Sequence, residues 1–326
     1  AQRSFSLRNC IEYSRSNNSN VKVAGYNVEI SNKKLSEQTG TYLPQLNATG
    51  TFDDNLQLTT QLMPAEMTGG TPGTYIAVKF GNKYSMNGGL QLTQKIFDAS
   101  AYQQIKSAKL NWKISEQSRE QTDIDVAYNI SLSFYQSLVV QMQAEVLRST
   151  LLASEKSLHS IELKFRNGMA KKIDVDRIKV SYNNTKSQLE QTVLSYSQSL
   201  NTLKYNMGMP VDSAIVLTDT LISEEYDSFV KGATVKFQLD NIIDYRLQES
   251  NVSSAKIDKK TKQSAFLPVL SFYGNYNYNA MRQEFNFFDS GKDWYSSSGI
   301  GLKLTIPLFD GFQRNSRLSQ SELNVK

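Results

Sequence analysis

Hydrophobic and polar residues alternate with period two in four short segments of the chain. In each segment the apolar side chains fall on one face and the polar side chains on the other, as in a half-exposed β-strand. Polar, turn-rich loops at residues 63–73 and 281–293 join the segments in pairs. The pattern predicts two β-hairpins, with strands at residues 46–58, 76–92, 270–279 and 300–306.

A much longer segment, residues 98–166, contains neither proline nor glycine. It predicts a single helix of about 70 residues, about 100 Å long at 1.5 Å per residue. After Gly168 a second helical pattern follows, so the two helices are expected to form an antiparallel hairpin. The expected contact seam is made of Leu147, Leu151, Leu158, Ile161 and Phe165 in the first arm, with Ser154 in the vacant position, and Leu189, Val193, Tyr196, Leu200, Leu203 and Met207 in the second.

These segments recur in the same order. A helical segment, a Leu-Pro turn and a strand pair lead to a Phe-Asp dipeptide and a helix, once before residue 99 and again after residue 238. The chain is therefore predicted to contain two copies of a helix, hairpin, helix unit. The predicted turns are at Leu43, Pro44, Leu267, Pro268, Pro307, Asp310 and Gly311.

Four amphipathic strands are too few for a closed barrel, which needs about eight, and open strand edges are costly in lipid. The strands are expected either to form a soluble sheet or to be completed by other copies of the chain. Three copies would supply twelve strands, with one face toward an aqueous lumen and one toward lipid. The expected lumen-facing residues are Asn47, Thr49, Lys79, Lys83, Asn87, Asn275, Asn277 and Lys303; the expected lipid-facing residues are Phe52, Val78, Phe80, Leu90, Leu92, Phe272, Tyr276, Ile300, Leu302 and Leu304.

Composition narrows the function classes. The 326 residues are 39% hydrophobic, which argues against one large dry core, and the net charge of +5 is too small for a nucleic-acid-binding surface. No apolar run approaches the length of a transmembrane helix. His159 has no partner residues at catalytic or metal-binding spacing, and Cys10 is expected to be a small buried hydrophobe. No catalytic motif is present, so we expect neither an enzyme nor a cofactor.

Five kinds of short motif occur in order along the chain. They are residues 5–13, the Leu-Pro-x-Leu turns at 43–46 and 267–270, residues 165–168 with 173–175, residues 203–210 and residues 304–311. In this order they resemble the TolC family of outer-membrane efflux and secretion channels, in particular its Bacteroidetes-type members. The resemblance implies that they are, respectively, the N-terminal helix, the barrel entries, the helical hairpin tip, the end of the second arm and the barrel exit.

This resemblance implies an α+β membrane protein that forms a homotrimer, with a twelve-stranded barrel in outer-membrane lipid and a helical tube in the periplasm. It implies a passive exit duct of a tripartite pump or type I secretion system, joined by a periplasmic adaptor to an inner-membrane transporter of RND, ABC or MFS type. The adaptor would bind the hairpin tip, which is Arg166, Asn167, Gly168, Met169, Lys171, Lys172 and Asp174. The rival hypothesis is a structural or adhesive trimeric coiled-coil protein whose strands form a soluble sheet.

The resemblance also implies a division of the chain. The segments are N-terminal helices (1–42), first hairpin (43–96), long helical hairpin (97–209), equatorial segment (210–237), tube helix (238–266), second hairpin (267–308) and the start of a second long helix (309–326). Two departures are evident. The first barrel exit, residues 94–99, lacks the proline and glycine of the second, so a different bend is expected. The family's second helical hairpin is absent, so we expect a C-terminally incomplete chain and assign no gate.

Overall fold

The computed structural model describes residues 3–219 and 238–326. Residues 220–237, most of the predicted equatorial segment, lie outside the described part. The chain divides into two compact units: a helical unit of residues 1–31 and 112–251, and a sheet unit of residues 32–111 and 252–326. Each is described separately below.

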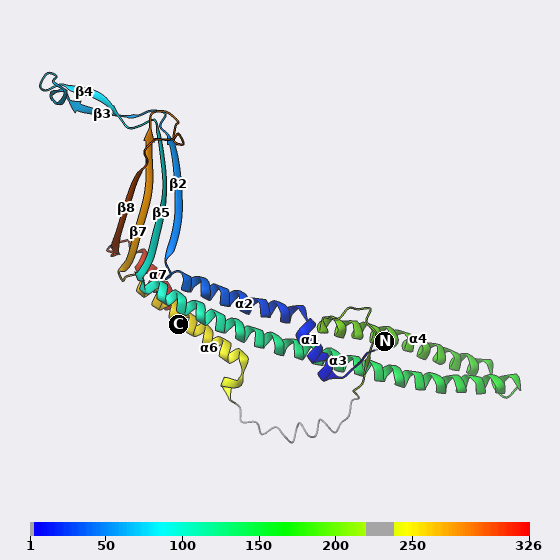
Figure 1. Cartoon of the computed structure of the whole chain (residues 1–326). Helices are drawn as coiled ribbons and strands as arrows, with labels where there is room; N and C mark the ends of the chain where they lie inside the picture. The colour runs from blue at the N-terminus through cyan, green and yellow to red at the C-terminus, as the bar shows by residue number, and fades with distance from the viewer. Residues whose placement is uncertain (1–2, 220–237) are drawn as a thin grey trace. The chain divides into compact units, whose positions relative to one another are not determined.

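The sheet unit contains one antiparallel sheet of four strands in the order β2-β5-β7-β8 (Figure 1). The two predicted hairpins therefore lie side by side, joined through β5 and β7. The strands enter and leave helices at one end of the sheet, here called the helix end, and loops connect them at the other, the loop end. The strands are β2 (Gln45–Asp54), β5 (Tyr84–Phe97), β7 (Val269–Arg282) and β8 (Tyr295–Thr305).

The predicted second strand, residues 76–92, is wrong as a single element. Gly81 has φ +118°, a conformation that favours glycine, and the chain turns there. The first part becomes β4 (Tyr75–Phe80), which pairs with β3 (Thr59–Pro64) in a separate two-stranded sheet. The first predicted strand also ends early, at Asp54.

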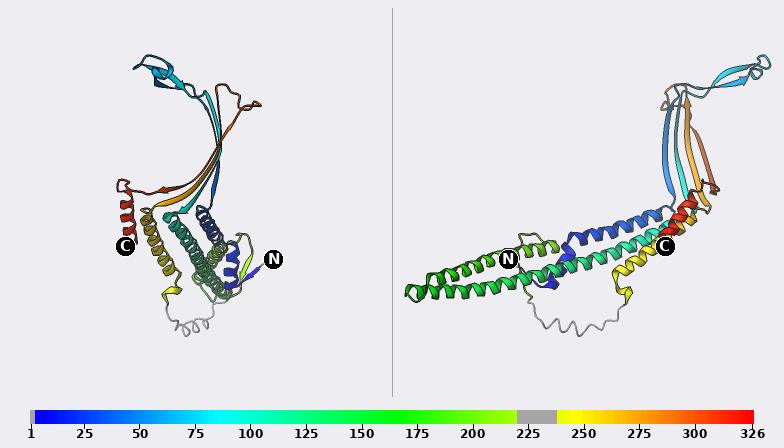
Figure 2. Two further views of the ribbon diagram at one scale, coloured as in Figure 1. Left: turned by 60° about the vertical axis from the view of Figure 1, so that its left-hand side comes forward. Right: turned by 180° about the vertical axis from the view of Figure 1, so that it is seen from behind.

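The β3–β4 sheet extends beyond the loop end of the four-stranded sheet (Figure 2). A short 3-10 helix, η1 (Ala65–Thr68), lies between its strands. Val78, Lys79 and Phe80 therefore lie outside the four-stranded sheet, and Lys83 lies in the connection to β5. Their assignment to the walls of a four-strand sheet is corrected accordingly: the apolar positions on the two sides of residues 81–83 are in phase, but polar Asn82 interrupts them where the backbone turns.

The helical unit contains the predicted hairpin except for residues 99–111 of its first arm, which belong to the sheet unit. Helix α3 (Ala99–Arg166) has 68 residues, which confirms the long unbroken helix, and α4 (Lys172–Met207) has 36. The Tyr196 hydroxyl donates to Gln141 Oε1 at 3.2 Å across the two arms. The seam differs from the expected one at two places, since Thr192 is buried where Val193 is 40% exposed, and Phe165 is 43% exposed.

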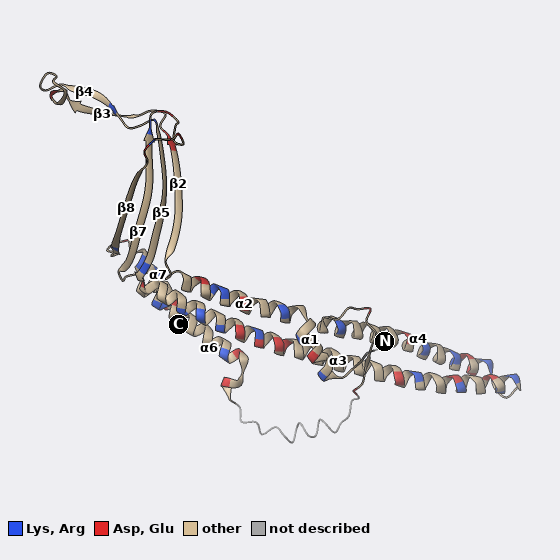
Figure 3. Ribbon diagram, viewed as in Figure 1, with Lys and Arg blue, Asp and Glu red and all other residues tan. Residues whose placement is uncertain are grey.

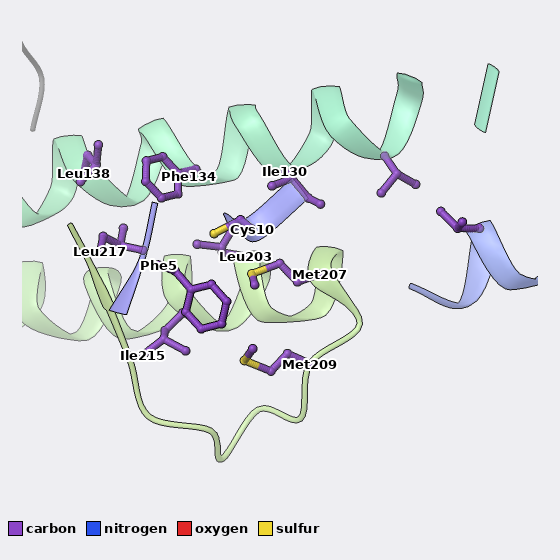
Figure 4. Packing of buried hydrophobic residues seen from close by; sticks show 12 residues of the cluster. Phe5, Cys10, Ile130, Phe134, Leu138, Leu203, Met207, Met209, Ile215 and Leu217 are labelled. Atoms are coloured by element: carbon purple, nitrogen blue, oxygen red, sulfur yellow. The ribbon is translucent and has the colours of Figure 1, made fainter. Parts of the chain in front are cut away.

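One buried hydrophobic cluster holds the helical unit together (Figure 4). It gathers residues from the chain's start, from the middle of α3 and from the end of α4. Cys10 is fully buried in it, as predicted, and burial, with the nearby Asp219 carboxylate, raises its pKa to about 12. The cluster consists of Phe5, Cys10, Val21, Val126, Ile130, Phe134, Leu138, Leu203, Met207, Met209, Ile215 and Leu217.

A two-stranded parallel sheet closes this cluster. Its strands, β1 (Arg3–Phe5) and β6 (Ile215–Leu217), are too short to produce a periodic sequence signal, and the sequence did not predict them. The remaining elements are α1 (Leu7–Asn17), α2 (Ser19–Gly40), the 3-10 helix η2 (Leu239–Asn241), α6 (Ile243–Ser264) and α7 (Gln313–Val325). Among the described residues, no helix has the length and hydropathy needed to cross a membrane.

Candidate functional site

The register of the four-stranded sheet places its residues on two contrasting faces. Residues directly opposite each other in antiparallel strands lie on the same face, so each cross-strand row can be assigned. One such row is Asn47, Gln91, Asn275 and Gly299; the next is Thr49, Gly89, Asn277 and Ser297. We call this side of the sheet the polar face.

Six of the eight expected lumen-facing residues share the polar face. The Asn87 side chain donates to Asn279 on the neighbouring strand, and the Asn277 side chain lies over Gly89, where a Cβ would be 2.1 Å from its Oδ1. Hydrogen-bonding side chains on the polar face therefore contact neighbouring strands of the sheet. The six are Asn47, Thr49, Asn87, Asn275, Asn277 and Lys303.

The opposite side, here called the apolar face, carries eight of the ten expected lipid-facing residues. Many of them are exposed in the single chain; Ile300 is 82% exposed and Leu302 64%. Charged residues are sparse over the four strands and frequent along α2, α3, α4 and α6 (Figure 3). The eight are Phe52, Leu90, Leu92, Phe272, Tyr276, Ile300, Leu302 and Leu304.

Aromatic residues gather at the loop end. Phe52 packs against Phe285 and Phe287 with ring centroids 5.6 and 6.0 Å apart, and Phe287 is 2% exposed. The Trp294 indole donates to the Phe287 carbonyl at 3.3 Å. Aromatic residues at the ends of strands are typical of proteins whose strands cross a lipid layer.

At the helix end, the polar face is hollowed into a cavity of about 620 Å³. Its lining is mostly uncharged and polar, with two lysines, Lys95 and Lys303, and no carboxylate. The hydrogen-bonding side chains in it are Thr41, Gln45, Gln91, Thr93, Ser271 and Tyr273.

The two predicted helix-to-strand turns have the same hydrogen bonding. At each, three successive backbone N–H groups bond carbonyls three residues earlier, and the helix ends at Leu-Pro. The last of these bonds in the first copy is donated by the Leu43 N–H to the Gly40 carbonyl at 3.0 Å. In the second copy the Leu267 N–H donates to the Ser264 carbonyl at 3.1 Å.

The first strand-to-helix exit is compact. Only Asp98 separates β5 from α3, and a register shift between Lys95 and Phe97 bends the strand there. The Asp98 carboxylate accepts the Ala101 N–H at 3.0 Å and the Lys95 ammonium at 2.9 Å, while the Tyr42 hydroxyl donates to the Asp98 carbonyl. Burial alone would raise the pKa of Asp98, but these partners outweigh it and lower the pKa.

The second exit is longer, with seven residues between Thr305 and α7. The Asp310 carboxylate accepts both the backbone N–H of Arg314, at 3.0 Å, and its side-chain Nε, at 2.8 Å. The guanidinium also donates to the Pro307 carbonyl at 3.0 Å and lies over the Phe266 ring. Burial acts against ionisation at Asp310 too, but the Arg314 contacts lower its pKa overall.

The tip of the helical hairpin is an exposed turn. Gly168 has φ +78° and ends α3, while the Met169 N–H bonds the Lys164 carbonyl at 2.8 Å. Asp174 lies in the first turn of α4, where a carboxylate favours the helix dipole. The other predicted tip residues, Arg166, Asn167, Lys171 and Lys172, are all exposed, and within the described part of the chain none forms an ion pair.

Comparison with known proteins identifies the family to which these surfaces belong. The family model described as outer membrane efflux protein matches residues 10–209 and 239–326. The chain belongs to the outer membrane efflux protein family. No curated protein matches the chain at a significant level.

Solved structures have the same fold as this efflux-family chain. The channel CusC superposes with a TM-score of 0.74 at 16% identity, over 98% of this chain and 69% of that one. The CmeC outer membrane channel of Campylobacter jejuni gives 0.73 at 15%, over 98% and 65%. A membrane protein from Pseudomonas aeruginosa gives 0.71 at 19%, over 98% and 71%.

Membership confirms the resemblance drawn from the sequence motifs and the predicted class of mixed helix and sheet with long helices. It places this efflux-family protein in the outer membrane of a bacterium, extending into the periplasm, as an efflux channel. The alternative of a structural or adhesive protein with a soluble sheet finds no support in the comparisons, since the matched family consists of outer-membrane channels.

Proposed function

We propose that three copies of this chain form a passive outer-membrane duct that is the exit of a tripartite efflux pump or type I secretion system. The observation that carries the proposal is the two-faced sheet with two open edges. The polar face would line the lumen and the apolar face would contact lipid.

The strand directions support closure by further copies. In the antiparallel order β2-β5-β7-β8, the two edge strands β2 and β8 run in opposite directions. Edge β8 of one copy can therefore pair antiparallel with β2 of the next. Three copies would give twelve strands with no unpaired edge, and lipid excludes such edges because each unpaired backbone group costs several kcal/mol.

The hairpin tip is the proposed docking site for a periplasmic adaptor, which would link the duct to an inner-membrane transporter of RND, ABC or MFS type. The exposed cations Arg166, Lys171 and Lys172 suit a partner surface of opposite charge, and Met169 and Ile173, 71% and 62% exposed, add apolar contact area. The transporter would supply the energy for export.

Ser297 and Ser298 provide a matched test of the two faces. They are consecutive on β8, and the register places Ser297 on the polar face and Ser298 on the apolar face. In planar bilayers, a charged, membrane-impermeant thiol reagent should reduce the conductance of Ser297→Cys and leave Ser298→Cys unchanged. The native Cys10 does not interfere, because it is fully buried and its pKa is about 12.

The outcome decides between hypotheses. Block at Ser298→Cys alone would reverse the face assignment. A purified protein that stays in water without detergent and gives no conductance would contradict the channel.

Gly168 provides the corresponding test of the tip. A Cβ there meets no atom within 4 Å, so a substitution acts through the left-handed backbone and not through a clash. We expect Gly168→Val to abolish export and leave assembly intact, while Gly168→Asn, which tolerates this conformation, retains export. Normal export by Gly168→Val would show that the left-handed conformation at the tip is not required for export.

A further inference from the structure

The polar face carries charged side chains only near its two ends. Asp53 lies near the loop end, and Lys95 and Lys303 lie at the helix end. The rows between them contain amides, hydroxyls and glycines. Any preference of this face for ions of one sign must therefore come from its ends.

The two lysines at the helix end share one cross-strand row, Lys95-Ser271-Lys303, but differ in their partners. The Lys95 ammonium is 2.9 Å from the Asp98 carboxylate, which neutralises it. Lys303 is exposed, and no described carboxylate pairs with it. One uncompensated positive charge per chain thus remains at this level.

Around Lys303 the cavity lining favours an anion. The 620 Å³ cavity has no carboxylate, and its Gln, Thr, Ser and Tyr side chains can donate hydrogen bonds to an oxyanion. The Tyr273 ring, which lines the same cavity as Lys303, lies over Gly301, with its hydroxyl 2.6 Å from where a Cβ of residue 301 would be. A cation in this cavity would find neutral oxygen atoms, the unpaired Lys303 ammonium and the Lys95 ammonium that Asp98 neutralises.

We propose that Lys303 makes the helix end of the lumen anion-attracting, so that the duct favours cargo carrying carboxylate or other oxyanion groups. This inference rests on the proposed function, because it requires the polar face to line the lumen. In a trimer, three Lys303 side chains would form a ring at one level.

Barrel dimensions make such a ring effective. Twelve strands spaced about 4.8 Å apart and tilted about 40° enclose a backbone cylinder of about 12 Å radius. The lysine side chains point inward, so their charges lie within about one Debye length of the axis at 0.1 M salt, where that length is about 10 Å. At 1 M salt the length falls to about 3 Å, and the effect should disappear.

The experiment is the reversal potential of the purified channel in a planar bilayer under a KCl gradient near 0.1 M. We expect the chloride-to-potassium permeability ratio to fall about twofold or more in Lys303→Gln and further in Lys303→Glu. Gln91→Lys, which adds a charge two rows away on the same face, should raise the ratio. All differences should vanish at 1 M KCl.

Lys79→Gln is the matched control, because it removes a lysine from the β3–β4 sheet instead of the polar face. Its ratio should equal that of the unchanged protein. If the unchanged protein conducts and its ratio is unaffected by both Lys303 substitutions, the inference is overturned while the channel stands. If the unchanged protein does not conduct, the proposed function itself fails.

Discussion

The two strand-to-helix exits of the repeat share a Phe-Asp dipeptide and stabilise the bend by different contacts. In the first, Asp98 is 8% exposed and pairs with Lys95, which precedes it on the strand. In the second, Asp310 pairs with Arg314, which follows it in the helix. Both exits thus have an aspartate near the start of the helix. Its cationic partner comes from the preceding strand in the first exit and from the following helix in the second.

The helix-to-strand entry turns also share a backbone route and differ in their side-chain contacts. Tyr42 and Phe266 occupy equivalent positions before Leu-Pro, and only Tyr42 can donate a hydrogen bond, which goes to the Asp98 carbonyl. Phe266 instead lies under the Arg314 guanidinium, 5.2 Å from its ring centroid. Each exit is therefore connected to its own entry, through a hydroxyl in one copy and a cation–π contact in the other. The backbone route is shared, and the side-chain chemistry is specific to each copy.

The largest expected effect is on the stability of the inserted protein, and it tests whether the strands of the two copies face lipid in the same way. Leu92 and Ile300 flank Gly274 in one row of the apolar face, one from each copy. Lysine at either position should destabilise the membrane-inserted protein by about 2–4 kcal/mol per chain, since a charge would face lipid. The measurement is the denaturant midpoint after refolding into lipid vesicles.

The controls for this pair are Gln91→Lys and Ser297→Lys on the polar face. Gln91 is one residue from Leu92 on β5, and Ser297 is three residues from Ile300 on β8. Both should insert normally. Equal tolerance of lysine on both faces would contradict the assignment of the apolar face to lipid.

The next effect tests the exits against each other. Asp98→Ala removes the cap of α3 and leaves Lys95 without its partner, so we expect a loss of about 2 kcal/mol in the free energy of unfolding. Asp310→Ala should cost less, because the Asp310 side chain is 33% exposed. Denaturant titration of the two variants in detergent would compare them, and a larger loss at Asp310 would reverse the ranking.

A smaller effect is expected from exchanging the aromatic residues of the entry turns. Tyr42→Phe should cost about 1 kcal/mol, since it removes the hydrogen bond to the Asp98 carbonyl. Phe266→Tyr should be close to neutral, because the Arg314 guanidinium still finds an aromatic face. Thermal unfolding followed by circular dichroism would measure both, and equal losses would show that the shared backbone, not the hydroxyl, holds the first exit.

The smallest effect is a dependence on pH. The folded-state pKa of Asp98 is below its ordinary value of 3.8, so its contribution is complete above that value and declines as the pH falls through it toward the lowered pKa. Acid titration of the unfolding midpoint should show a steeper fall in the unchanged protein than in Asp98→Asn. Identical slopes would mean that the ion pair with Lys95 does not contribute to stability.

Much of the fold was predictable because long uninterrupted helical segments and alternating strand segments can be recognised from local sequence, without tertiary contacts. The absence of proline and glycine from residues 99–166 was enough for the 68-residue helix. Strict alternation placed six lumen candidates and eight lipid candidates on opposite faces, since any regular strand separates odd from even residues. The prediction of one continuous strand failed, because a turn of three residues changes the strand's partner without disturbing the alternation on either side. Val78, Lys79, Phe80 and Lys83 therefore lie outside the four-stranded sheet.

The sequence by itself determined the order of the long helices and of the strands of the four-stranded sheet, the two faces of those strands and the family, because each depends on local periodicity or on motifs a few residues long. Only the tertiary structure decided which strands are neighbours, that Lys95 is paired and Lys303 is not, and that β1 and β6 meet. The strand pairings join residues far apart in the chain, and the Lys95–Asp98 ion pair, although only three residues apart, depends on the bend between β5 and α3. These contacts stabilise the fold only when the groups are brought together in three dimensions, so no local sequence pattern predicts them.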